Sequence, residues 1–191
     1  MSGDIERVLS FWLNEVGPQG WLKPDINVDV KAEHAFGDLW KRGADGDLSS
    51  WICTPDGCLA LIILLDQFPR AMFRGTGQAY GSDPTALAVA KRAIVMGHDL
   101  KLPEPQRQFF YLPLMHSESL MDQERCVRLM SLRLPKADAE MLAHARAHRD
   151  IIRQFGRFPY RNELLGRKST DAEDAYMSAG GYATTMAHVA A

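Results

Sequence analysis

Apolar residues recur at steps of three and four along most of the chain, a spacing that predicts helices. The clearest apolar stripes lie in residues 4–14, 26–42, 83–96, 119–134 and 137–155. Residues 55–68 also favour a helix, with Pro55 in its first turn. Its middle, residues 59–65, is apolar on all sides, so we expect it at the centre of the core. A buried strand is the alternative there, but no segment alternates with a strand's period of two.

Glycine, proline and capping residues indicate where these helices end. We expect Gly17-Pro18 to end the first helix, and Pro113 to kink a helix over residues 104–117. Thr170 and Glu173 form a capping box for a last helix that ends at residues 180–181. We therefore predict a single all-α domain over residues 1–180, made of antiparallel helix pairs in a tetratricopeptide-like array or bundle. Residues 181–191 carry no charged group and are predicted to be a poorly ordered tail.

Composition narrows the class of protein. The chain has 191 residues and a net charge of −2, so no strong field attracts nucleic acid or an anionic membrane. The longest apolar run, residues 58–65, is far shorter than the ~20 residues that span a bilayer. Three cysteines without metal-ligand spacing argue against a disulfide framework and favour a reducing compartment. We predict a cytoplasmic protein.

The first candidate site lies at the end of the apolar helix. Asp66 is placed where the helix dipole disfavours a negative charge, and Arg70 and Arg74 are the nearest cations. One interpretation is a structural ion pair that braces the turn at Pro69. The other is a carboxylate in a pocket wall, with both arginines holding an anionic substrate.

Histidines supply the second candidate. His116 follows apolar positions at helical steps, so its imidazole is predicted to point inward beside the proline kink. His144 and His148 are four residues apart and share one helical face. His116 is either a core residue with a polar partner or a general base. His144 and His148 are either core histidines or metal ligands, and His148 is predicted to be the more buried of the two. A metal would need a further ligand, and none is evident, so we predict no metal and no cofactor.

The third candidate is the turn that follows the longest helix. Gly156 and Pro159 end that helix, and the turn is rich in groups that bind anions. A planar guanidinium binds a carboxylate through two parallel hydrogen bonds. We therefore expect a peptide carboxylate or a small anion to bind here, at Arg157, Tyr160, Arg161 and Asn162.

Three stretches resemble one family. They are LALIILLDQFPRAMFRG at residues 59–75, FYLPLMHSE at 110–118 and HRDIIRQFGRFPYRN at 148–162. Together they are similar to the largely bacterial family known as domain of unknown function 924. The resemblance implies an all-α fold similar to tetratricopeptide-repeat proteins and no agreed activity. Its motif positions fall on Asp66, Gln67, Arg70, Arg74, His116, Glu118, His148, Arg157, Arg161 and Asn162. Members often have histidine where this chain has Tyr160.

Two functions follow from these candidates. The first is a binding or scaffold protein that holds a peptide carboxylate or small anionic molecule against Arg70, Arg74, Arg157 and Arg161. The second is a hydrolase- or transferase-type enzyme for a small anionic substrate. In it His116 and His148 act as acid and base, and Asp66 orients one of them. Both require Asp66, His116 and His148 to meet around one polar pocket.

Overall fold

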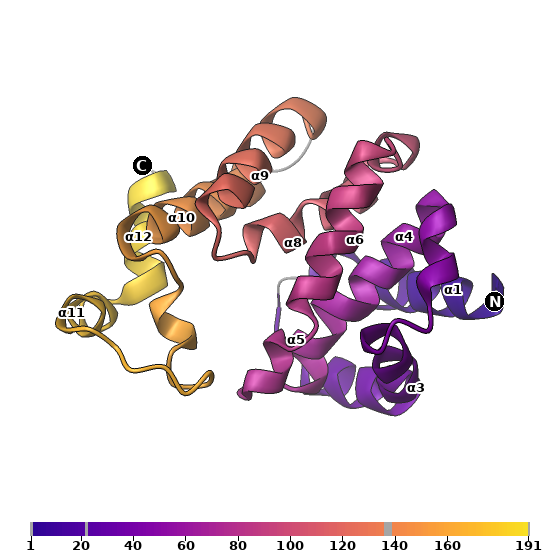
Figure 1. Cartoon of the computed structure of the whole chain (residues 1–191), viewed down its shortest axis with the longest axis horizontal. Coiled ribbons are helices and arrows are strands. Elements are labelled where there is room, and N and C mark those ends of the chain that lie inside the picture. Colours follow the sequence, from indigo (N-terminus) through magenta and orange to yellow (C-terminus); the bar gives the residue numbers. More distant parts are fainter. Residues whose placement is uncertain (1, 22, 136–138, 191) are drawn as a thin grey trace. The chain divides into compact units, whose positions relative to one another are not determined.

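The structure is a computed structural model that describes residues 2–21, 23–135 and 139–190 (Figure 1). Every regular element among these residues is a helix, so the predicted all-α class is confirmed. The chain divides into two compact units, unit 1 at residues 1–113 and unit 2 at residues 114–191. The single domain over residues 1–180 and the tetratricopeptide-like array stay predictions.

Unit 1 contains most of the helices. Its elements are α1 (Ser2–Leu9), η1 (Ser10–Val16), α2 (Gly17–Gly20), α3 (Ile26–Ala44), η2 (Ser49–Cys53), α4 (Pro55–Ile62), η3 (Ile63–Gln67), α5 (Phe68–Met72), η4 (Gly77–Tyr80), α6 (Asp83–Val95), η5 (Asp99–Lys101), α7 (Glu104–Arg107) and η6 (Gln108–Phe110). Of the η segments, η1 and η3 are π-helical and the others are 3-10 turns.

Unit 2 begins within α8 (Leu112–Met115), which lies at the boundary. It continues with α9 (Leu120–Arg133), α10 (Ala139–Phe155), the 3-10 turn η7 (Pro159–Arg161), α11 (Asp171–Ser178) and α12 (Gly181–Ala190). Helix α10 packs against α9 and α12, and α11 packs against α12 and η7. The predicted capping box is present, because Thr170 and Glu173 bond to each other's backbone at the start of α11.

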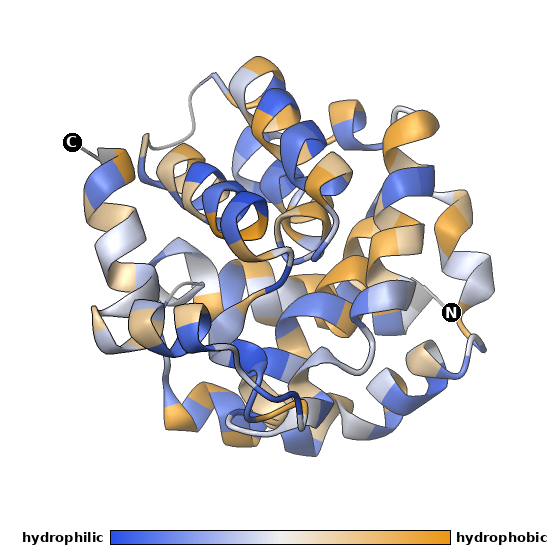
Figure 2. Cartoon of the chain, turned by 60° about the vertical axis from the view of Figure 1, so that its left-hand side comes forward, coloured by the Kyte–Doolittle hydropathy of each residue, from blue (hydrophilic) through white to orange (hydrophobic). Residues whose placement is uncertain are grey.

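The apolar segment forms the core of unit 1, as predicted. Residues 58–65 are at most 3% exposed, and α4 packs against α1 and α6 (Figure 1). Phe68 continues this core, with the rings of Phe11, Trp12 and Phe36 at 5.7, 5.6 and 4.9 Å from its own. Along most helices hydrophobic and hydrophilic residues alternate in bands (Figure 2), as amphipathic helices require.

Three local predictions differ from the structure. Residues 104–115 form the short pieces α7, η6 and α8 instead of one kinked helix. Pro113 lies inside the predicted helix and lacks the N–H that a continuous helix needs. The first helix continues beyond residue 14 through η1, and α2 follows at Gly17. Residues 181–190, predicted to be a poorly ordered tail, form helix α12, because the Tyr182 ring packs against the core of unit 2.

Replacing Leu59 by alanine should lower the free energy of unfolding by about 2–5 kcal/mol, because a fully buried leucine leaves a cavity. Urea denaturation monitored by circular dichroism measures the change. Val95→Ala is the matched control, since Val95 is 78% exposed and should change stability by at most ~0.5 kcal/mol. Equal effects of the two substitutions would contradict the central position of α4.

Candidate functional site

The residues selected from the sequence fall into two groups, one in each unit. Unit 1 contains Asp66, Gln67, Arg70 and Arg74, all on η3 and α5 or just after them. Unit 2 contains the other seven, namely His116, Glu118, His148, Arg157, Tyr160, Arg161 and Asn162. The structure brings residues together within each group, and the meeting of Asp66 with the histidines stays a prediction.

Asp66 lies in the π-helical turn that joins α4 to α5. Pro69 has no N–H and cannot donate to the carbonyl of Leu65, four residues earlier. Ser82 Oγ donates to that carbonyl instead, over 2.6 Å, and Trp40 Nε1 donates to Ser82 Oγ over 3.0 Å. The wider turn therefore continues the helix past the proline with its freed carbonyl satisfied. It leaves the Asp66 side chain fully buried.

Two neighbours hold the Asp66 carboxylate. Gln67 donates to it through Nε2, and Arg70 Nη1 lies 3.6 Å from its Oδ1. Arg70 also donates to both carboxylate oxygens of Asp83, at 3.0 Å each. Burial by itself would lower the pKa of Arg70, but Asp66 and Asp83 together raise it above its ordinary value. The group is therefore an internal ion cluster.

Arg74 has a similar partner. Its Nε and Nη2 each donate to the carboxylate of Asp29 over 2.8 Å, which joins the end of α5 to α3. An aspartate already neutralises the charge of each arginine through a two-point hydrogen bond, which weakens its attraction for an anionic ligand. Their assignment as ligand-binding residues stays a prediction, and this geometry favours the structural interpretation.

In unit 2 the turn after α10 is built around Phe158. Gly156 has a φ of 71°, a left-handed conformation that glycine adopts without strain, and its N–H donates to the carbonyl of Ile152 over 2.9 Å. The helix stops there, and the chain turns so that Phe158 enters the core with Ile151 and Ile152. Phe158 is fully buried.

An ion pair binds both backbone groups of Phe158. Glu118 Oε1 accepts from the Phe158 N–H over 2.8 Å, and Arg167 Nη2 donates to the Phe158 carbonyl over 3.2 Å. The two side chains also join each other through two hydrogen bonds of 2.6 and 3.0 Å. Burial would raise the pKa of Glu118, but the hydrogen bonds from Arg167 and the Phe158 N–H lower it below its ordinary value. We call this arrangement the Phe158 clamp.

Arg157 and Asn162 point to other partners. Arg157 donates to both carboxylate oxygens of Glu173, over 2.5 and 2.6 Å, and so joins the turn to the start of α11. These hydrogen bonds lower the pKa of Glu173 to about 2. Asn162 is buried and donates to Ser169 Oγ over 3.1 Å. Both contacts are structural, so the predicted use of these residues for a ligand gains no support from them.

His116 lies in the loop between α8 and α9, and its backbone is fixed from two sides. Gln123, fully buried on α9, donates through Nε2 to the carbonyls of Met115 and Ser117, each over 2.6 Å. Arg161 Nη1 donates to the carbonyl of His116 itself over 3.1 Å. The loop therefore holds the His116 imidazole at a set position, with its ring centroid 6.2 Å from that of His148.

His148 has a defined tautomer. Its Nδ1 lies 2.8 Å from the carbonyl oxygen of His144, which can only accept, so the proton of the neutral imidazole is on Nδ1. Nε2 then carries a lone pair. Among the residues that the structure describes, no hydrogen-bond donor reaches this atom. His148 and Arg161 both lie against the Phe158 ring. The Cζ atom of Arg161 is 4.4 Å from the centroid of this ring, and the centroid of the His148 ring is 5.4 Å from it.

The same surroundings keep His148 neutral. Burial lowers the pKa of His148, the nearby His116 and Arg161 lower it further, and the hydrogen bond to the His144 carbonyl offsets only part of this. The resulting pKa is about 3, against an ordinary value of 6.5. At neutral pH the side chain is therefore a hydrogen-bond acceptor at Nε2.

Tyr182 of α12 completes the surroundings of the histidines. Its hydroxyl lies 2.5 Å from Nδ1 of His144 and 3.4 Å from Nδ1 of His148. Burial raises the pKa of the phenol, so the hydroxyl keeps its proton and can donate to His144. The other nitrogen of His144 lies 3.8 Å from Glu140 Oε1, which favours a proton there. The hydroxyl of Tyr182 thus lies within hydrogen-bond distance of Nδ1 of both histidines.

Four rings contact each other in a closed sequence, which we call the aromatic cycle. The centroid distances are 5.4 Å for His148 to Phe158, 5.4 Å for Phe158 to Tyr160, 6.1 Å for Tyr160 to Tyr182 and 5.0 Å for Tyr182 to His148. Tyr160 stacks on Phe158 as part of this cycle. The cycle contains the imidazole of His148 and joins α10, η7 and α12.

Sequence reasoning did not select three residues of this arrangement as site residues. Tyr182 was assigned to the tail, although an aromatic residue directly after Gly180-Gly181 is compatible with a second helix. Gln123 gives no sequence signal, since only its burial and three carbonyl partners distinguish it. The sequence signal for Arg167 is its position shortly after the stretch at residues 148–162.

The described residues offer little for a metal. No group of three or more His, Cys, Asp or Glu side chains among them is arranged to hold an ion. None of the described helices combines the length and the apolar character needed to cross a membrane.

Comparison with known proteins identifies the family of the chain. The family described as "Bacterial protein of unknown function (DUF924)" matches residues 8–181. The chain therefore belongs to the DUF924 family. It is similar to a solved structure, the protein of unknown function ATU0120 from Agrobacterium tumefaciens. The two are 39% identical, the match covers 92% of this chain and 97% of the other, and the TM-score is 0.86. No curated protein matches the chain.

The pKa of His148 predicts a pH dependence of stability. Below pH 6.5 the unfolded chain binds a proton on this imidazole, whereas the folded protein does not until the pH approaches 3. Unfolding therefore takes up a proton in this interval, and stability falls as the pH falls. Between pH 7 and 5 the loss from this residue should be roughly 2 kcal/mol. Urea denaturation of the wild type and of His148→Gln at both pH values measures it.

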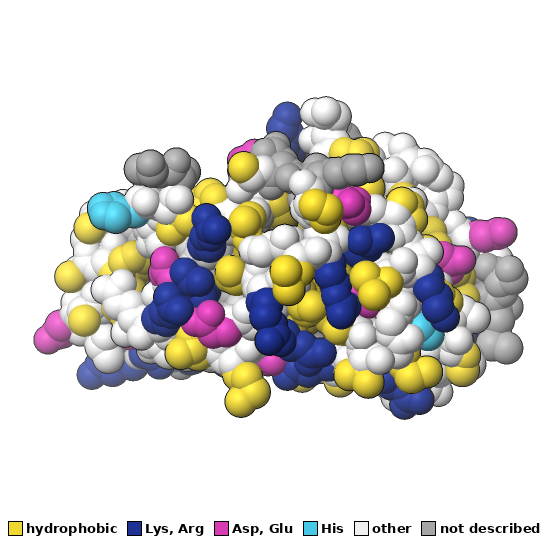
Figure 3. Space-filling model, turned by 90° about the horizontal axis from the view of Figure 1, so that it is seen from above, with side chains coloured by type: hydrophobic (Ala, Val, Ile, Leu, Met, Phe, Trp, Pro, Cys, Tyr) yellow, Lys and Arg dark blue, Asp and Glu magenta, His cyan; other side chains and the backbone are white. Residues whose placement is uncertain are grey.

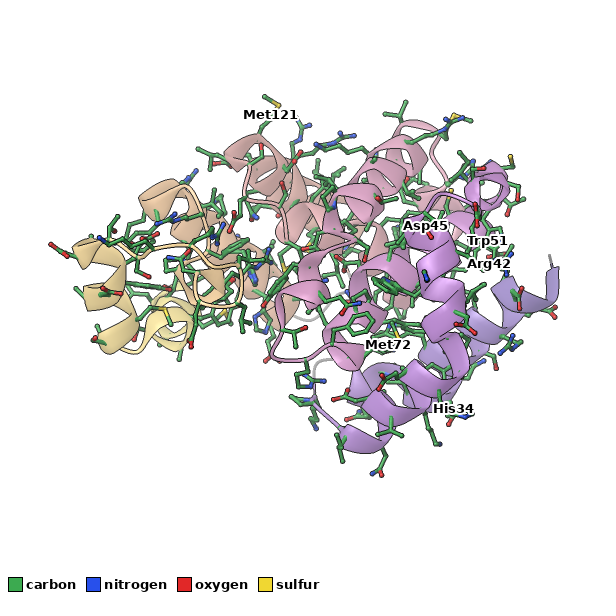
Figure 4. All side chains as sticks on the ribbon, turned by 60° about the horizontal axis from the view of Figure 1, so that its bottom comes forward. His34, Arg42, Asp45, Trp51, Met72 and Met121 are labelled. Carbon is green, nitrogen blue, oxygen red and sulfur yellow. The ribbon has the colours of Figure 1, made fainter. Side chains whose placement is uncertain are left out.

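The wild type should lose more stability than His148→Gln over this interval. His34→Gln is the control, because His34 is exposed and projects from α3 (Figure 4), and it should keep the wild-type pH dependence. An unchanged pH dependence in His148→Gln would contradict a neutral folded-state imidazole.

The Phe158 clamp predicts a difference between two arginines. Arg167→Met leaves the Glu118 carboxylate and the Phe158 carbonyl without their partner and should lower the free energy of unfolding by about 1–3 kcal/mol. Arg153→Met removes exposed ion pairs with Glu124 and Asp150 and should change it by at most ~1 kcal/mol. Thermal denaturation at neutral pH compares the two. A larger loss in Arg153→Met would show that the clamp contributes little.

Proposed function

We propose that this protein binds a small carboxylate or other small anion in unit 2, beside His116, His148 and Arg161. The single observation behind this proposal is the lone pair on His148 Nε2, which has no donor among the described residues, next to the cationic Arg161 on the Phe158 ring. A donor-rich cation beside a vacant acceptor is suited to a polar, negatively charged ligand. The ligand is either the carboxylate end of a peptide or a small free acid.

Electrostatics support an anion at this position. Arg161 is buried, at 6% exposure, and a charge in such surroundings interacts more strongly with a ligand than one in water. Arg161 also contributes to the low pKa of His148. An anion placed near both groups would offset that contribution and raise the pKa of His148. Ligand binding and protonation of His148 are therefore linked, which provides a spectroscopic signal.

Catalysis by His116 and His148 is the second candidate. One observation favours it, since the fixed tautomer of His148 presents a basic nitrogen. A pKa of about 3, however, makes a weak base at neutral pH, where effective bases titrate near the working pH. An anionic substrate that raised this pKa would improve the base. The role of Asp66 as an orienting residue belongs to this candidate and stays a prediction.

Charge does not favour nucleic acid as a partner. The net charge is −2, and on the face drawn in Figure 3 the Lys and Arg side chains are interspersed with Asp and Glu. All three cysteines are free, and Cys58 and Cys126 are buried. Free cysteines are typical of a reducing compartment, so we propose that the protein is located in the cytoplasm.

Titration with acetate tests the proposal. We expect long-range ¹H–¹⁵N spectra of the imidazoles to show saturable shifts of His148 and His116, and a raised pKa of His148. Acetate has few atoms, so its dissociation constant should be roughly millimolar or weaker. Arg161→Gln should abolish the shifts, and Arg161→Lys should retain part of them because it keeps the charge. Acetamide, which is neutral and of similar size, should cause none.

Arg153→Gln is the control variant, because Arg153 is exposed and paired with Glu124. It should titrate as the wild type does. Linear, non-saturating shifts with acetate, or equal responses to acetate and acetamide, would overturn the proposal.

A further inference from the structure

We infer that the ligand of this site carries an O–H or N–H donor on the atom attached to its carboxylate-bearing carbon, as a 2-hydroxy acid or an N-acylated amino acid does. This inference rests on the proposed function and specifies its ligand class. The shared chemistry is a hydrogen-bond donor next to a carboxylate. A free hydroxy acid and the last residue of a peptide are the two sources of it.

The tautomer of His148 carries the argument. A neutral imidazole has one donor nitrogen and one acceptor nitrogen. The donor, Nδ1, is occupied by the carbonyl of His144 at 2.8 Å. Nε2 therefore faces a ligand only as an acceptor, and a ligand atom beside it must donate. Arg161 can only donate, so the ligand atom beside it must accept.

The groups around His148 keep Nδ1 as the donor nitrogen and Nε2 as the acceptor nitrogen. Turning the His148 ring over would direct a C–H group at the His144 carbonyl and leave that carbonyl without this donor. The charged and titratable groups around the ring are His116, His144, Tyr182 and Arg161, and Glu140 lies beyond His144. The Tyr182 hydroxyl already has an acceptor in His144 Nδ1. None of these groups supplies His148 Nε2 with a proton in the structure.

The positions of the two groups limit the size of the ligand. His148 and Arg161 contact the same ring, Phe158, and His116 is a second common neighbour through its ring and its carbonyl. The proposed ligand bridges the two groups with a few heavy atoms. A hydroxyl on the carbon that bears a carboxylate has this short separation from it. An amide N–H on that carbon has the same short separation. A long dicarboxylate or a phosphodiester does not combine a donor and an anion in this way.

Matched ligand pairs test the inference. Glycolate has the hydroxyl donor and methoxyacetate lacks it, while N-acetylglycine has the N–H donor and N-acetylsarcosine lacks it. We expect the donor-bearing member of at least one pair to bind the wild type about tenfold more tightly in the imidazole titration, since an unmatched buried acceptor weakens binding strongly. A larger ratio for glycolate indicates a free hydroxy acid, and a larger ratio for N-acetylglycine indicates a peptide end.

His148→Phe should reduce both ratios to near one, because the acceptor is gone while the ring remains. His34→Phe is the matched control, and it should leave the ratios at their wild-type values. The ¹⁵N shifts of wild-type His148 give a measurement that needs no variant, and they should show a protonated Nδ1.

The outcomes separate this inference from the proposed function. Ratios near one in the wild type, with acetate still binding saturably, would overturn the inference and leave the proposed function standing. Failure of acetate and of all four matched ligands to bind would overturn both. A proton on Nε2 of wild-type His148 would overturn the inference by itself.

Discussion

The backbone of Phe158 is the constraint on which the site in unit 2 depends. Glu118 and Arg167 satisfy its N–H and its carbonyl and bind each other, so one residue is held by an ion pair from two separate segments. Because the backbone of Phe158 is held, its ring is also held in place. Arg161 lies over this ring, and His148 lies beside it. A cation and a neutral imidazole thus become neighbours without contacting each other directly.

The histidines differ in character because their partners differ. His148 donates to a carbonyl and lies beside a guanidinium, which keeps it neutral. His144 lies beside the hydroxyl of a tyrosine and near a glutamate. Two imidazoles one helical turn apart therefore have different surroundings. The proposed preference for a donor on the ligand rests on the acceptor nitrogen of His148.

Unit 1 shows the opposite use of similar residues. Arg70 pairs with Asp66 and Asp83, and Arg74 pairs with Asp29. The π-turn at η3 directly precedes Phe68 and Pro69, and Ser82 donates to the Leu65 carbonyl, to which the proline cannot donate. Motif arginines can therefore serve the fold as readily as a ligand. Arg157 in unit 2, bound to Glu173, is a further example.

Helical spacing alone predicted the all-α class, the buried apolar helix and the capping box at Thr170, because these depend on contacts between residues a few positions apart. The same local pattern could not show that Tyr182 packs on His148, or that Gln123 and Arg161 fix the loop at His116. It also could not show that Arg70, Arg74 and Arg157 pair with carboxylates, or that Arg161 lies near the His148 imidazole. Partners 6 to 49 residues apart decide these properties, since the charge and proton position of a side chain depend on which groups the fold places against it.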